Sequence, residues 1–128
     1  MRKRKTACVA EERRSGTATA YVPERGDIIW LDFDPHAGRE QAKRRPAVVL
    51  SPSAYNGRTS LALCCPVTSH VKGYPFEVPL PDALEVRGVV LADQVRSLDW
   101  RARHANHLGT LPAAAVAQLL ARTRVLLA

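Results

Sequence analysis

Residues 27–33 read DIIWLDF, and residues 46–51 read PAVVLS. Both stretches are rich in the β-branched and aromatic residues that favour strands. The second is apolar on both faces, which indicates a strand in the centre of a sheet. Between them lies a polar segment that contains Pro35 and Gly38 and is typical of a long loop. The two stretches therefore predict two strands joined by a long polar loop.

Further strands are predicted along the rest of the chain. A strong turn signal, Asn56-Gly57, follows the second stretch, with room for one helical turn before it. Short apolar runs with the composition of strands then occur at residues 61–67, 76–80, 88–93 and 95–98. Several short strands separated by turn signals predict a small β-barrel.

The end of the chain has the pattern of a helix. Thr110 is expected to cap it, and Pro112 is expected in its first turn. One apolar stripe runs through Val116, Leu119, Leu120 and Leu127. The predicted fold class is therefore mainly β, a small barrel with a C-terminal helix of roughly four turns packed against it.

Charge divides the chain into two parts. The 128 residues suit one domain and have a net charge of +7. Residues 1–20 hold six basic and two acidic residues, hence +4, and residues 21–128 hold 13 and 10, hence +3. We expect a flexible basic N-terminal extension, residues 1–20, and one folded domain, residues 21–128. The extension is either a solvated tail or an arm that attracts nucleic acid.

Several classes of protein are excluded by pattern. No apolar run approaches the roughly 20 residues of a membrane span. Cys8 and the adjacent pair Cys64-Cys65 indicate reduced thiols, as in a cytoplasmic protein. The four histidines are scattered, and the chain has neither a nucleotide-binding glycine loop nor an acyl-transfer nucleophile motif. We therefore expect no metal site and no cofactor.

The polar loop of residues 34–45 is the first candidate site. Its functional side chains are His36, Arg39, Glu40, Gln41, Lys43, Arg44 and Arg45. Arg45 directly precedes the second strand, so a rigid root would let its guanidinium hold a phosphodiester through two hydrogen bonds. Glu40 supplies a carboxylate for proton transfer or for reading a base edge. A solvated hairpin tip is the alternative interpretation of the same charges.

Two further polar groups are candidates for contact with a phosphate or an unpaired base. The first, at a predicted strand end, comprises Thr68, Ser69, His70, Lys72 and Tyr74. Its hydroxyls can donate to phosphate oxygens, and its aromatic ring can stack on an unpaired base. The second comprises Asp93 and Gln94, followed by Arg96. Turn-stabilising roles are the alternative for both groups.

These stretches, in this order, resemble the MazF/PemK family of toxin endoribonucleases from bacterial toxin–antitoxin pairs. The resemblance covers residues 21–128 and is strongest to the MazF members. It is carried by YVP (21–23), GDIIWLDFDP (26–35), EQ (40–41), RPAVVLSP (45–52), YN (55–56), Pro66, Thr68, KGYPFEV (72–78), LADQVRS (91–97) and WRAR (100–103).

The resemblance implies a fold, an activity and partners. The fold is the SH3-like barrel of the MazF/Kid/CcdB type, as a homodimer that a MazE-like antitoxin covers. The activity is metal-independent cleavage of single-stranded RNA, mostly mRNA, with an ACA-like triplet favoured. Arg45 is then the chief catalytic residue, Thr68 its partner and Glu40 the acid of the first loop. The residues expected to bind RNA are Gln41, Lys43, Arg44, Ser69, Lys72, Asp93 and Gln94, with His36 and His70 as assisting residues.

The expected reaction is an internal transesterification. The ribose 2′-OH attacks its own 3′ phosphorus and expels a 5′-OH, which leaves a 2′,3′-cyclic phosphate. The identity of the general base stays open, because Glu40 has a suitable charge while Arg45 is nearly always protonated. Two other functions also stay open: a CcdB-like DNA gyrase poison and a non-catalytic SH3-like binding module. A gyrase poison on this fold has no need for Arg45 with Thr68.

Overall fold

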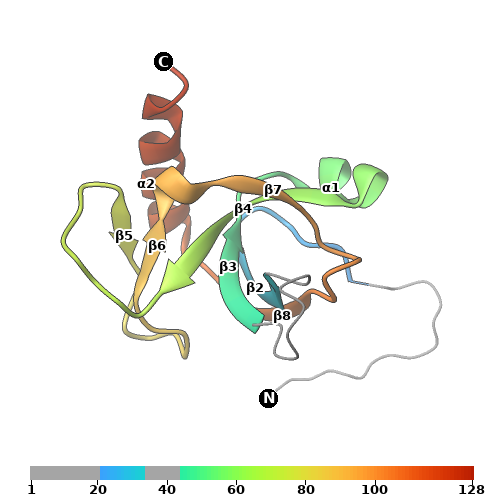
Figure 1. The fold of residues 1–128 in the computed structure, drawn as a ribbon, viewed down its shortest axis with the longest axis horizontal. Helices are drawn as coiled ribbons and strands as arrows, with labels where there is room; N and C mark the ends of the chain where they lie inside the picture. Colours follow the sequence, from blue (N-terminus) through green and yellow to red (C-terminus); the bar gives the residue numbers. More distant parts are fainter. Residues whose placement is uncertain (1–20, 34–43) are drawn as a thin grey trace.

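This computed structural model describes residues 21–33 and 44–128. All the strands within these residues belong to one antiparallel sheet. The expectations for residues 1–20, and for His36, Glu40, Gln41 and Lys43, lie outside the described residues. The strands are β2 (Asp27–Asp32), β3 (Arg44–Val49), β4 (Leu61–Thr68), β5 (Glu77–Pro79), β6 (Val89–Leu91), β7 (Arg96–Asp99) and β8 (Asn106–Thr110). The helices are α1 (Ser53–Thr59), α2 (Ala113–Val125) and the 3₁₀ turn η1 (Ala92–Gln94) (Figure 1).

Strand β4 connects the two halves of the sheet. Its neighbours follow the order β5-β6-β4-β3-β2-β8, and β7 also pairs with β4. On one side β4 pairs with β3, through Ala47 opposite Pro66. Its residues Leu61 to Cys64 pair with β7, and Val67 and Thr68 pair with β6. As expected from its two apolar faces, β3 lies in the interior of the sheet, between β2 and β4.

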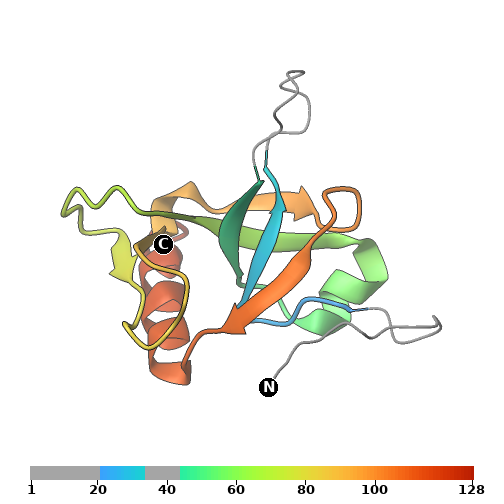
Figure 2. The ribbon, with the colours of Figure 1, turned by 90° about the horizontal axis from the view of Figure 1, so that it is seen from below.

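The alternation of side chains along the strands creates two cores. The helix-side core comprises Ile28, Val48, Leu50, Cys65, Val67, Val78, Leu80, Val90, Ala92, Leu111 and Leu119. The barrel core comprises Ile29, Leu31, Phe33, Ala47, Val49, Ala62, Cys64, Leu98 and Trp100. Consecutive residues of one strand thus face different cores, because successive strand side chains point to opposite faces. Helix α2 packs on the first core beside β5 and β6 (Figure 2).

The adjacent cysteines illustrate this alternation. Cys64 faces the barrel core and Cys65 the helix-side core, and both are free thiols, as expected for an adjacent pair. Burial is the main cause that raises the pKa of each to about 12. Both therefore stay protonated at neutral pH and act as small apolar side chains.

The prediction of a turn at Asn56-Gly57 is wrong, because both residues lie inside α1. The fully buried Asn56 amide donates to the carbonyl oxygens of Pro23 (2.8 Å) and Ser51 (2.9 Å) and accepts from the Ser51 hydroxyl (2.6 Å). These hydrogen bonds, the one to the distant Pro23 above all, outweigh the local turn preference. The chain turns instead at Ser60, whose φ of 69° ends the helix.

The predicted start of the C-terminal helix also needs correction. Thr110 belongs to β8, a strand the sequence did not predict, where it pairs with Asp27. Pro112 occupies the cap position of α2 without a side-chain hydrogen bond. Leu127 lies beyond the last turn and is 82% exposed, so it is not part of the buried stripe.

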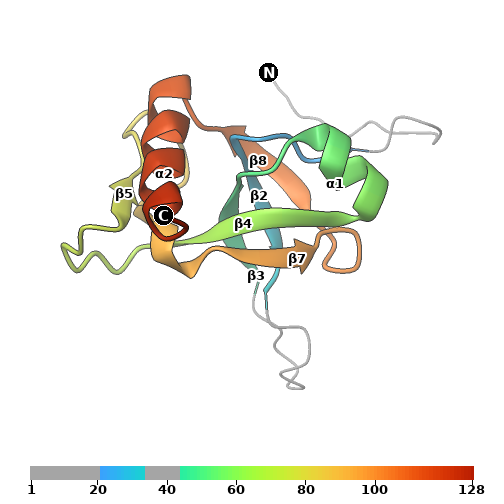
Figure 3. The same ribbon diagram turned by 90° about the horizontal axis from the view of Figure 1, so that it is seen from above.

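The barrel is partly open. Among the described strands, β8 pairs only with β2, and β7 only with β4. The β7–β8 connection is held to β2, because the Asp32 amide donates to the Arg103 carbonyl oxygen at 3.0 Å. Figure 3 shows α2 and α1 at opposite ends of β4. No helix within the described residues is long and apolar enough to span a membrane.

Gly88 should be indispensable for folding. It precedes β6 with φ of +120°, and a Cβ atom there would lie 2.1 Å from the Thr68 carbonyl oxygen. Gly73 also has positive φ, +85°, but a Cβ would meet nothing within 4 Å. We expect Gly88→Ala to lower the free energy of unfolding by more than about 3 kcal/mol, since strain and clash add. Gly73→Ala should cost about 1–2 kcal/mol. Equal losses in urea denaturation would contradict this account.

Candidate functional site

Arg45 and Thr68 come from neighbouring strands and share one face of the sheet. Leu31 of the barrel core pairs with Arg45, and Ala47 pairs with Pro66. The β3–β4 ladder ends at Ala47 and Pro66, and the same register continued by two residues would set Arg45 opposite Thr68. Directly opposed side chains point to the same face, here the face of the barrel core. Arg45 is exposed and Thr68 half-buried, so both are accessible at the end of that core.

The Thr68 hydroxyl is held by the following turn. Its Oγ1 accepts the His70 amide at 3.1 Å, which is the turn-stabilising role anticipated as the alternative. The contact uses a lone pair of the oxygen and not its proton. That proton has no acceptor among the described residues, so it can still be donated to a ligand oxygen.

Arg44 is engaged within the chain. Its Nη1 contacts Asp32 Oδ1 at 2.7 Å, and its Nη2 donates to the carbonyl oxygens of Trp30 (3.1 Å) and His104 (2.9 Å). Asp32 Oδ2 also lies 3.1 Å from His104 Nδ1. Hydrogen bonding to His104, and then to Arg44, holds the pKa of Asp32 below its usual value. We call Asp32, Arg44 and His104 the root cluster, because it anchors the strand from which Arg45 projects.

Arg103 holds the end of β2 against the β7–β8 connection. Its Nη1 donates to the carbonyl oxygens of Asp32 (3.1 Å) and Phe33 (2.6 Å). The sequence singled out Arg103 only as part of a motif. No local pattern reveals this role, because the partners lie about 70 positions away.

Arg96 is a cation of the same face, which the sequence analysis named beside Asp93 and Gln94 without giving it a role. It pairs with Cys64 and lies two residues before Leu98 in β7, so it shares a face with these two members of the barrel core. Its guanidinium carbon lies 5.2 Å from the centre of the Phe33 ring, which is a cation–π distance. A charge on the inward face of a strand is the signal that would have identified it. Asp93 and Gln94 are exposed in η1 shortly before it.

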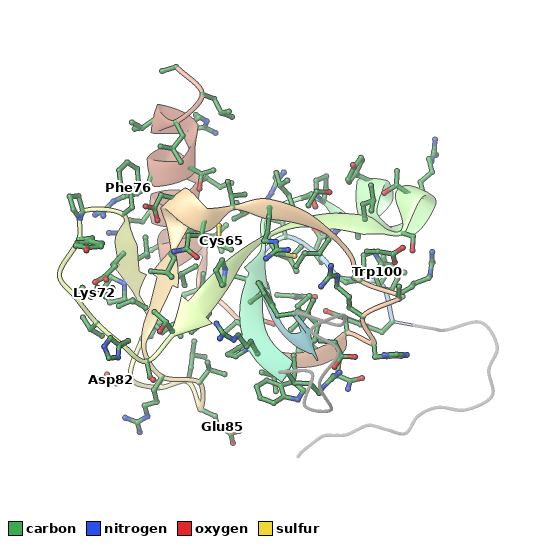
Figure 4. All side chains as sticks on the ribbon, in the orientation of Figure 1. Cys65, Lys72, Phe76, Asp82, Glu85 and Trp100 are labelled. Carbon is green, nitrogen blue, oxygen red and sulfur yellow. The ribbon has the colours of Figure 1, made fainter. Side chains whose placement is uncertain are left out.

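The remaining predicted contacts lie on the β4–β5 connection. Ser69, His70 and Lys72 are exposed there, and Figure 4 shows Lys72 at the edge of the molecule. The Lys72 ammonium lies 5.7 Å from the centre of the Tyr74 ring. Within residues 21–33 and 44–128, no three His, Cys, Asp or Glu side chains come together as metal ligands would.

Comparison with known proteins gives the family. Residues 24–127 match the model of the "PemK-like, MazF-like toxin of type II toxin-antitoxin system". The chain belongs to this toxin family. It is 53% identical to the endoribonuclease toxin MazF of Escherichia coli (strain K12) over 84% of this chain and 96% of that one. It is 37% identical to the endoribonuclease PemK of Escherichia coli, over 81% of each chain.

Solved structures agree with the assignment to the PemK-like, MazF-like toxin family. A MazE–MazF crystal structure from Deinococcus radiodurans matches with a TM-score of 0.78 and 56% identity, over 84% of this chain and 97% of that one. The resemblance noted in the sequence is thereby confirmed, as is the expected fold, mainly antiparallel β with a C-terminal helix.

The root cluster should make stability depend on pH. Because the pKa of Asp32 is lowered on folding, its contribution to stability is present above the unfolded pKa, about 3.9, and is lost as pH falls through the folded value. The difference in unfolding free energy between wild type and Asp32→Asn should therefore be present at pH 7 and shrink below about pH 4. Denaturant melts across this range measure it. Asp82→Asn, on the exposed β5–β6 connection, serves as control. A difference that is constant with pH would contradict the role of the Asp32 charge.

Proposed function

We propose that this protein is the endoribonuclease toxin of a type II toxin–antitoxin system, acting in the cytoplasm. Its substrate is single-stranded RNA, chiefly mRNA, cut at a short sequence so that translation is inhibited. Family membership and 53% identity to the Escherichia coli MazF toxin support the proposal. The observation that carries it is that Arg45, opposite Leu31, and Thr68, two residues after Pro66, lie on the barrel-core side of the neighbouring strands β3 and β4.

The proposed reaction is transesterification by the ribose 2′-OH. Negative charge gathers on the phosphate oxygens in the transition state, so a fixed cation stabilises that state more than the ground state. Arg45 supplies this cation, since the root cluster holds the neighbouring residue in place. The Thr68 hydroxyl donates a hydrogen bond to a phosphate oxygen. Glu40, which lies outside the described residues, is proposed as the group that moves the 2′-OH proton.

The proposed partners follow from the family. A MazE-like antitoxin is the expected inhibitor, since the solved relatives include MazE–MazF structures. We further propose that residues 21–128 form the toxin domain, that it acts as a homodimer, and that residues 1–20 are an extension of it. Gln41, Lys43, Ser69, Lys72, Asp93 and Gln94 are proposed to contact RNA, with His36 and His70 assisting. Arg44, whose guanidinium is engaged within the chain, is proposed to act mainly by holding the strand root.

Arg45→Ala tests the proposed cation. We expect kcat for RNA cleavage to fall by about 10²–10³-fold, as for loss of one group that stabilises transition-state charge. Arg58→Ala, in the exposed part of α1, removes an arginine of equal charge and should leave kcat unchanged. Gel assays on a short RNA give the rates, and thermal melts verify folding. Near-wild-type cleavage by folded Arg45→Ala would remove Arg45 from the mechanism.

The products test the proposed chemistry. Because the nucleophile belongs to the substrate and Arg45 carries the charge, cleavage should persist in excess EDTA. The fragments should end in 2′,3′-cyclic phosphate and 5′-OH, as mass spectrometry would show. A 2′-deoxy nucleotide at the scissile position should block the reaction. Strict dependence on Mg²⁺, or cleavage of the deoxy substrate, would contradict transesterification.

A further inference from the structure

Glu77 is a buried carboxylate that faces the backbone of the loop before it. The residue is 8% exposed, and its backbone pairs with Leu91 of β6. Its Oε1 accepts the Gly73 amide at 2.8 Å, and its Oε2 accepts the Lys72 amide at 3.0 Å. None of the ion pairs found within residues 21–33 and 44–128 involves Glu77. Its charge is therefore balanced mainly by these two backbone donors.

Two successive amides that converge on one anion form a small anion-binding nest. A buried carboxylate is tolerated when such charge-assisted hydrogen bonds replace its hydration. The turn is closed by the Glu77 amide, which donates to the Tyr74 carbonyl oxygen at 3.1 Å, and by Gly73 at φ of +85°. Residues 72–77 are thus wrapped around the Glu77 side chain.

The second half of this loop has independent supports. Arg122 of α2 donates to the Pro75 carbonyl oxygen. Phe76 packs on the helix-side core, and its carbonyl oxygen accepts the Ala92 amide at 2.9 Å. The contacts that hold Lys72 and Gly73 come instead from Glu77. The position of the first half therefore depends on this one carboxylate.

A cation and an aromatic ring are presented by the segment that Glu77 holds. The Lys72 ammonium lies 5.7 Å from the centre of the Tyr74 ring, and Tyr74 is 57% exposed. An ammonium can bind a phosphate while a ring beside it stacks on an unpaired base. Such a pair suits one nucleotide of a single strand only if the two side chains keep their relative position.

We propose that Glu77 is a positioning residue for RNA recognition, which holds the backbone at Lys72 and Gly73 so that Lys72 and Tyr74 receive the same nucleotide. The inference rests on the proposed function and adds to it a residue that touches no RNA. Glu77 acts on binding of the substrate. Arg45 and Thr68, which come from strand ends, act on the chemical step.

Glu77→Gln in the full chain tests this role. The carboxamide has nearly the same size, but its NH₂ group opposes an amide donor and the charge is lost. We expect KM for a short single-stranded RNA to rise about tenfold, with kcat within about twofold, because the charged hydrogen bonds order the loop. The variant also gains one positive charge overall, which by itself would tighten RNA binding. A rise in KM therefore runs against the bulk electrostatic effect.

Glu85→Gln is the matched control. It makes the same substitution on the exposed β5–β6 connection, which Figure 4 shows apart from Lys72. Its KM should be unchanged or slightly lower. Hydrogen exchange gives a direct structural readout, since the Lys72 and Gly73 amides should exchange at least about tenfold faster in Glu77→Gln and not in Glu85→Gln.

A double-mutant cycle connects Glu77 to the group it positions. Lys72→Ala added to Glu77→Gln should raise KM little further, because the ammonium is already misplaced. If Glu77→Gln does not fold, Glu77→Asp, whose shorter carboxylate cannot reach both amides, takes its place in every measurement.

Three results would overturn the inference. The first is a KM for the Glu77 variant equal to that of Glu85→Gln, and the second is a loss confined to kcat. The third is full additivity with Lys72→Ala. If the wild-type chain cleaves RNA, these results reject the role of Glu77 alone. If the wild-type chain cleaves no RNA, the proposed function fails, and this inference fails with it.

Discussion

The close approach of two backbones at Gly88 and Thr68 is the constraint on which the structure depends. Only a residue without Cβ lets β6 start beside the end of β4. Through that contact, the part of the sheet that packs on α2 joins the barrel. The same contact is made by the backbone of Thr68, the last residue of β4, whose hydroxyl belongs to the proposed site. A packing requirement of the fold thus lies next to that site.

Charged groups divide into those that hold the backbone and those that face solvent. The Asp32–Arg44–His104 root cluster and Glu77 bind groups of the chain itself, at the root of β3 and inside the β4–β5 connection. Their neighbours Arg45 and Lys72 are exposed. An exposed cation on a rigid support loses little freedom on meeting a phosphate, which favours recognition and transition-state stabilisation. On this division rest the different roles proposed for the adjacent arginines Arg44 and Arg45.

The presence of most strands could be predicted from local patterns, whereas the helix at Asn56 and the strand β8 could not. The apolar runs around Ile28 and Val48 became buried strands as expected. Asn56 lies in a helix because its amide is satisfied by distant backbone, a partner no local window contains. The polar strand β8 was missed because an edge strand is stabilised by pairing with β2 rather than by its own apolar pattern.

The sequence by itself determined the family, the mainly β composition and the residue types of the site, although the structure places Arg45 inside the start of β3 and Thr68 at the end of β4 rather than just outside these strands. Family, composition and residue types are properties of local order and spacing, which a linear pattern records. Only the tertiary structure decided that Arg45 and Thr68 share a face, that Arg44 is engaged at the strand root and that Glu77 supports Lys72. These facts depend on strand register and on hydrogen bonds between distant residues. Both are settled by how the whole chain packs, since any single segment is compatible with many partners.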